Sequence, residues 1–143
     1  MRLLGIDPGE KHIGVAVCDA HGTAARPLET VIHRSRDLDV ARLVEIARAQ
    51  ECEGFVIGHA LDPDGQPKPQ GRSAERLADA LRLASGLPVW LHDEWGSSRA
   101  ALTLMIQAGK RRRARREHQH AAAAAAILQS YLDASPRETP SGE

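Results

Sequence analysis

This chain of 143 residues has few cysteines, no long apolar run and no surplus of either charge. Cys18 and Cys52 are far apart and form no C-x-x-C pair, which argues against a zinc site or a disulfide framework and fits a reducing compartment. The opening apolar run is too short for a signal peptide, and no later run approaches the roughly 20 residues of a membrane span. We therefore expect a cytoplasmic protein without membrane association.

The balance of charge is even overall but uneven along the chain. Lys and Arg together number 19, as do Asp and Glu, so the chain as a whole does not indicate a polyanionic partner. Residues 110–116, however, read KRRRARR. The candidates for phosphate contacts there are Lys110, Arg111, Arg112, Arg113, Arg115 and Arg116. A solvated charged loop is the alternative interpretation.

Apolar periodicity predicts an α/β domain. Three strand-like segments separated by turn signals come first and indicate an antiparallel meander, and strands and helices then alternate. The expected strands are 2–7, 12–19, about 23–33, 54–58 and one from 89, and the expected helices are 37–50, 73–84, 97–108 and 117–134. We expect a mixed central sheet, three antiparallel strands followed by parallel ones, with flanking helices. The domain is 1–134, and the polar, Pro-containing tail 135–143 is expected to be disordered.

Three side chains at the expected element ends could carry chemistry. Asp7 ends the first apolar run, where a carboxylate is costly unless it is hydrated, paired or bound to a cation. Glu94 follows the strand VWLHD, and His120 begins the core-facing stripe of the last helix. We expect these three groups to converge.

Two carboxylates and an imidazole are typical ligands of Mg²⁺ or Mn²⁺, and such ions can activate water and hold a phosphodiester without a protein nucleophile. The positive end of the last helix would disfavour protonation of His120. Simpler interpretations also exist. Asp7 could cap a turn, Glu94 could be a solvated helix cap, and His120 could be a hydrogen-bonded core histidine.

The motifs resemble one known family along most of residues 1–133. The matching positions are Asp7-x-Gly9 with Lys11, Ile13-Gly14-Val15-Ala16, Asp19, Gly22, Ala25-x-Pro27-Leu28, Gly58, Asp64-Gly65, His92-Asp93-Glu94, Ser97-Ser98, Ala123-Ala124 and Ile127-Leu128-Gln129-Ser130-Tyr131-Leu132. This pattern resembles the YqgF (RuvX) family of pre-16S rRNA nucleases, relatives of RuvC-type Holliday junction resolvases. The resemblance implies an RNase H-like fold and a divalent-metal nuclease site.

Carried over by position, the acidic triad of the family falls on Asp7, Glu94 and His120. Most members have Asp at the last position, and imidazole ligation would favour Mn²⁺ over Mg²⁺. Trp95 stands where Arg is usual, and His59-Ala60 replace Leu-Pro.

The expected function is that of a metal-dependent endonuclease, as a monomer or homodimer, acting on structured RNA or branched DNA. The resemblance implies 5′-end maturation of pre-16S rRNA in ribosome biogenesis, Holliday junction resolution, or both. Lys11 and the 110–116 run would contact nucleic acid. One alternative is a binding module that has lost catalysis. Another is nucleotide binding, since an Asp-x-Gly turn also opens sugar kinases and actin-like ATPases, although 143 residues make only one of the two domains that they need.

Overall fold

The computed structural model describes residues 1–59, 69–93 and 119–134. The elements in these ranges are β1 (Leu3–Asp7), β2 (His12–Cys18), β3 (Ala25–Ile32), α1 (Arg36–Ala49), β4 (Gly54–His59), α2 (Pro69–Ser85), β5 (Val89–Asp93) and α4 (Gln119–Ala134). The expected helix at 97–108 and the expected disordered tail at 135–143 lie outside the described residues. No helix in the described ranges is long and apolar enough to cross a membrane.

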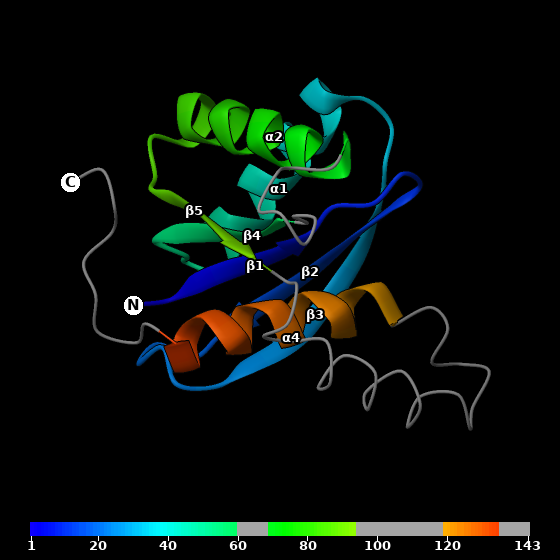
Figure 1. Cartoon of the computed structure of the whole chain (residues 1–143). Helices are drawn as coiled ribbons and strands as arrows, with labels where there is room; N and C mark the ends of the chain where they lie inside the picture. Colours follow the sequence, from blue (N-terminus) through cyan, green and yellow to red (C-terminus); the bar gives the residue numbers. More distant parts are fainter. Residues whose placement is uncertain (60–68, 94–118, 135–143) are drawn as a thin grey trace.

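The sheet has the expected mixed topology. Its strand order is β3-β2-β1-β4-β5, with β1 to β3 antiparallel and with β1, β4 and β5 parallel (Figure 1). The carboxyl ends of β1, β4 and β5 therefore lie at one edge of the sheet. The same edge holds the start of β2, because β2 runs antiparallel to β1.

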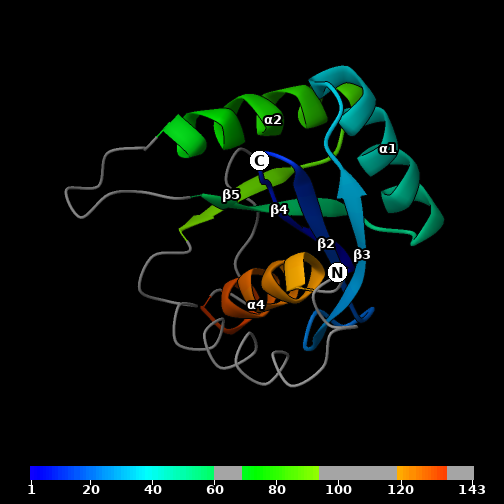
Figure 2. The same cartoon turned by 90° about the vertical axis from the view of Figure 1, so that its right-hand side faces the viewer.

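Helices cover both faces of this sheet, which gives three layers (Figure 2). Helices α1 and α2 lie on one face, where Leu4 and Ile6 join a cluster with Phe55. Helix α4 lies on the other face, where Leu3 and Trp90 belong to a second cluster. The alternation of side chains along each strand explains why neighbouring residues belong to different clusters.

Helix α4 approaches the sheet closely because the facing side chains are small. Five of the six alanines at 121–126 are buried. On the sheet, Gly5 and Gly14 lie under the helix, and a Cβ atom at Gly14 would be 1.8 Å from the carbonyl oxygen of His120. The glycines and alanines together set how deep α4 lies, and hence where its first turn is held.

The largest differences from the expected element boundaries are at the starts of α2 and β3. Helix α2 begins at Pro69 rather than at 73, since proline is tolerated in the first turn, where its missing N–H would have no helical partner. Strand β3 begins at Ala25 rather than near 23. The carboxylate of Asp19 accepts a hydrogen bond from the backbone N–H of Thr23 at 2.7 Å, which keeps that residue in the preceding turn.

Substituting Gly14 should test the packing of α4 directly. Gly14→Ala is expected to lower the free energy of unfolding by more than about 3 kcal/mol, because the added methyl meets backbone that cannot move alone. Gly54→Ala is the matched control. Its Cβ would be 2.7 Å from the ring of Trp90 and 3.1 Å from the carbonyl oxygen of Pro88, a less severe overlap than at Gly14, and should cost about 1–3 kcal/mol. Urea unfolding followed by circular dichroism measures both, and equal costs would contradict this account of the packing.

Candidate active site

Asp7 is the last residue of β1 and pairs with Gly14 of β2. Asp7 lies four residues after Leu3, which is packed under α4. Because side chains alternate along a strand, both side chains point to the α4 face. Asp7 is half-buried. The carboxylate therefore emerges at the sheet edge, on the side where α4 begins.

His120 lies in the first turn of α4, and its backbone carbonyl sits over Gly14. Because Gly14 is also the pairing partner of Asp7, one glycine brings both candidate residues together. The imidazole of His120 stacks on that of His12, with ring centroids 4.8 Å apart and planes at 16°. Asp7, His12 and His120 thus gather around the start of β2.

His12 received no role from the sequence, because no metal-ligand spacing includes it. The signal that could have found it is strand alternation. His12 is two residues before Gly14 and so lies on the same face of β2, beneath the predicted helix start. That inference requires the pairing of β1 with β2, which the hairpin signal at Pro8-Gly9 suggested but did not fix in register.

Burial lowers the pKa of His120, and the charge of His12 lowers it further. The sequence predicted the same direction from the helix N-terminus, but desolvation of the ring is the larger cause. A neutral imidazole keeps a lone pair on one ring nitrogen, which is the form that binds metal ions. The carboxylate of Asp7 adds an oxygen donor, so the two groups match the donor chemistry of Mn²⁺ and Mg²⁺.

The remaining predicted residues are only partly within the described chain. Strand β5 ends at Asp93, at the same edge as Asp7, and Glu94 lies outside the described residues. Trp95 and the basic run 110–116 also lie outside them. Lys11 is exposed in the turn between β1 and β2. Within the described ranges, no three His, Cys, Asp or Glu groups could hold a metal ion together, so these ranges supply only part of the predicted ligand set.

Proton NMR of the histidine rings should show the effect of burial on His120. The pKa of His120 is expected below that of a histidine in an unstructured peptide. His12→Asn should raise this pKa partly towards the peptide value, because it removes one charge and the ring that stacks on His120. The unfolded chain takes up this proton near the ordinary histidine pKa of about 6.5, before the folded chain does. His120 therefore costs no stability above that pH and reduces stability as the pH falls through it. A pKa unchanged by His12→Asn would contradict the assigned causes.

Comparisons with known proteins identify the family of this chain. The family model described as "RuvX: Holliday junction resolvase" matches residues 1–134. A protein of Syntrophus aciditrophicus named "Putative pre-16S rRNA nuclease" is 41% identical over 96% of this chain and 92% of its own. A protein of Bacillus cytotoxicus with the same name is 37% identical over 94% of this chain and 99% of its own.

Solved structures agree in fold. RuvC of Thermus thermophilus in complex with a Holliday junction substrate superimposes with a TM-score of 0.62 at 18% identity, covering 95% of each chain. The Holliday junction resolvase of fowlpox virus gives a TM-score of 0.59 at 14% identity, covering 94% of this chain and 99% of that one. These likenesses establish the RNase H-like fold that the sequence predicted. With the full-length family match and relatives about two-fifths identical, the chain belongs to the RuvX family.

Proposed function

We propose that this protein is a divalent-metal-dependent nuclease that hydrolyses phosphodiester bonds, with pre-16S rRNA as its substrate. One observation carries the proposal. The carboxylate of Asp7 and the neutral imidazole of His120 are held at one sheet edge around Gly14. The relatives named as pre-16S rRNA nucleases, which match this chain along nearly its full length, support the choice of substrate.

Asp7, Glu94 and His120 would hold the metal. When bound, a divalent ion supplies an activated water and stabilises the leaving oxygen of the phosphodiester. The residues of this chain hold the ligand side chains in position. Asp7 offers a carboxylate fixed by the β1–β2 register, and His12 holds the ring of His120 by stacking on it. Burial lowers the pKa of His120, which favours the neutral ring with a ligand nitrogen available.

Basic side chains would hold the substrate backbone. Lys11 is exposed four residues after Asp7, and the run KRRRARR precedes α4 in sequence by a few residues. Contacts of Lys and Arg with phosphates release counterions, so binding should weaken steeply as salt is added. Both groups would position the strand without reading its sequence.

Asp7→Asn should separate the nuclease from a module that only binds nucleic acid. Mn²⁺ affinity and cleavage of a labelled 16S rRNA precursor are both expected to fall at least about 100-fold, because an amide is a neutral and poorer ligand. Calorimetric titration of Mn²⁺ and gel analysis of the RNA measure the two effects. Asp79→Asn is the matched control, since the Asp79 side chain is 74% exposed on α2.

Three other results would each contradict or redirect the proposal. Unchanged cleavage by Asp7→Asn would remove Asp7 from the mechanism. RNA binding without metal uptake or cleavage by the wild-type protein would favour a module that has lost catalysis. Cleavage of a four-way DNA junction in place of the RNA would keep the site and change the substrate.

His120→Asp tests whether the imidazole sets metal preference. Replacing a nitrogen ligand by a carboxylate is expected to raise the Mg²⁺-supported cleavage rate relative to the Mn²⁺-supported rate, because Mg²⁺ prefers oxygen ligands. Electron paramagnetic resonance of bound Mn²⁺ provides a readout independent of activity, since the loss of a nitrogen ligand alters its hyperfine couplings. An unchanged metal preference together with unchanged couplings would exclude His120 as a ligand.

A further inference from the structure

A hollow of about 590 Å³ lies beside the turn that follows Asp7, on the α1 and α2 side of the sheet. The turn contributes Pro8 and Gly9, and Leu77 of α2 lines the opposite side. Asp7 itself points to the α4 face, so the hollow and the candidate active site occupy opposite faces of the same sheet edge. Nothing in the proposed chemistry uses the hollow.

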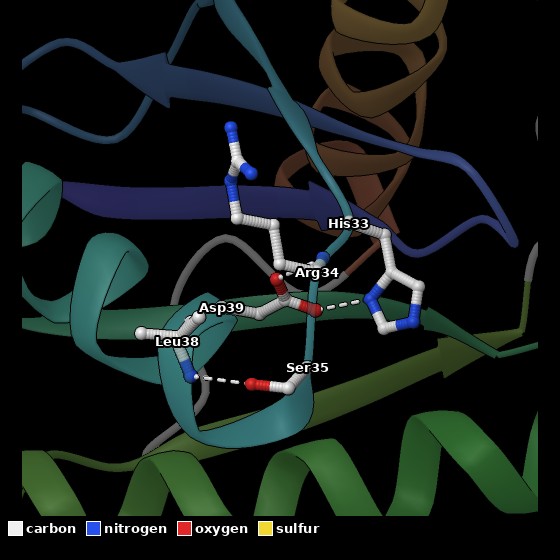
Figure 3. A network of polar contacts seen from close by, with 5 residues as sticks. All are labelled: His33, Arg34, Ser35, Leu38 and Asp39. Carbon is white, nitrogen blue, oxygen red and sulfur yellow. Dashed lines mark hydrogen bonds and ion pairs between the residues drawn. The ribbon is translucent and has the colours of Figure 1, made fainter.

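A buried carboxylate holds a histidine at the wall of this hollow (Figure 3). The side chain of Asp39 is only 5% exposed, and one of its oxygens contacts Nδ1 of His33. Its other oxygen accepts a hydrogen bond from the backbone N–H of Arg34 at 3.0 Å. With both carboxylate oxygens engaged, Asp39 fixes the position of the His33 ring.

The fixed ring leaves its second nitrogen for a ligand. The side chain of His33 is 40% exposed, and Figure 3 shows the ring joined to Asp39 through Nδ1, with Nε2 on the far side. A protonated histidine donates from both nitrogens. Ser35, Arg36 and Ser73 line the same hollow, so residues whose side chains can donate hydrogen bonds surround it.

We propose that this hollow binds a backbone phosphate of the nucleic-acid strand, through His33 and Arg36. The proposal rests on the proposed function and extends it, since it places a second contact on the face opposite Asp7. The backbone N–H of His33 donates to the carbonyl of Lys11 at 2.9 Å, which ties the hollow to the turn at the active edge. A strand held at Asp7 would cross this turn to reach His33.

Once Asp39 is paired with a protonated His33, the hollow is lined by one further cation, Arg36, and one further anion, Glu10. Asp39 is already paired with His33 and is buried, so it is a poor ligand for a cation. Within the described part of the chain, no group of three acidic, His or Cys side chains could bind a metal. Glu10 is the opposing charge, but it is exposed in the turn and can extend into water. Glu10→Gln is accordingly expected to strengthen binding.

The test measures binding of a fluorescein-labelled single-stranded RNA by anisotropy, with a chelator present so that no cleavage occurs. His33→Asn retains an amide N–H near the position of Nδ1, which satisfies Asp39, and removes only the outer nitrogen. Arg36→Gln removes one exposed charge. Each variant is expected to bind about 10-fold more weakly. For Arg36→Gln, the slope of log affinity against log salt should become shallower by about 0.7.

Matched controls lie far from the hollow. His21→Asn changes an exposed histidine in the turn between β2 and β3, and Arg48→Gln changes an exposed arginine in the last turn of α1. Both should bind RNA as the wild type does. An oligonucleotide with uncharged methylphosphonate linkages should bind the wild type and the two test variants equally weakly, which distinguishes a strand phosphate from a base contact.

The outcomes distinguish this proposal from the nuclease proposal. If the wild type binds RNA and neither His33→Asn nor Arg36→Gln weakens that binding, the hollow has no role in binding the strand, whatever the cleavage assays show. If both variants weaken binding and Asp7→Asn leaves cleavage unchanged, the hollow is retained and the assigned catalytic role of Asp7 is not. A wild-type protein that binds no RNA overturns the hollow as a site for an RNA phosphate, and the cleavage assays alone then decide the nuclease proposal.

Discussion

The contact between Gly14 and the backbone of His120 is the constraint on which the candidate site depends. A helix with side chains of ordinary size would lie farther from the sheet, and its first turn would not reach the end of β1. The alanines of α4 and the glycines beneath it let the helix lie closer to the sheet. The pairing of Gly14 with Asp7 then fixes the carboxylate next to the helix start. Packing of small residues, rather than any polar contact, thus positions the polar groups.

Much of this architecture could be predicted from local pattern. Alternating apolar residues and the Pro8-Gly9 turn identified the strands, and the alanine run identified a helix lying close to a sheet. The boundaries of α2 and β3 were less accurate, because a proline in a first helical turn and the Asp19–Thr23 contact are decided by a few atoms. Periodicity indicates which face of an element is buried, but not the residue at which the element begins.

The candidate site could be predicted only where the topology brings the ends of strands and helices together. Asp7 follows from the rule that parallel strands present their carboxyl ends at one edge, and His120 follows from its place at the start of the core-facing stripe of α4. The structure brings the backbone of both residues to Gly14. The stacking of His12 depends on the β1–β2 register, and the pairing of His33 with Asp39 depends on how the chain turns into α1. No characteristic spacing of residues in the sequence indicates either contact. The ligand roles of Asp7, Glu94 and His120 and the phosphate role of residues 110–116 stay predictions.

The contact of α4 with Gly14 involves smaller groups than the packing under α1 and α2, and this difference bears on how the sequence can diverge. The layer under α1 and α2 contains Phe55, Leu43 and Leu81, whose volumes can be exchanged among neighbours at modest cost. The layer under α4 also holds large side chains such as Trp90, but at the start of the helix alanine and glycine can lose almost nothing, and Gly14 can gain nothing without displacing the helix. Divergence within this fold should therefore accumulate in the first layer, while the contact of Gly14 with the start of α4 is retained even in a descendant that no longer cuts nucleic acid.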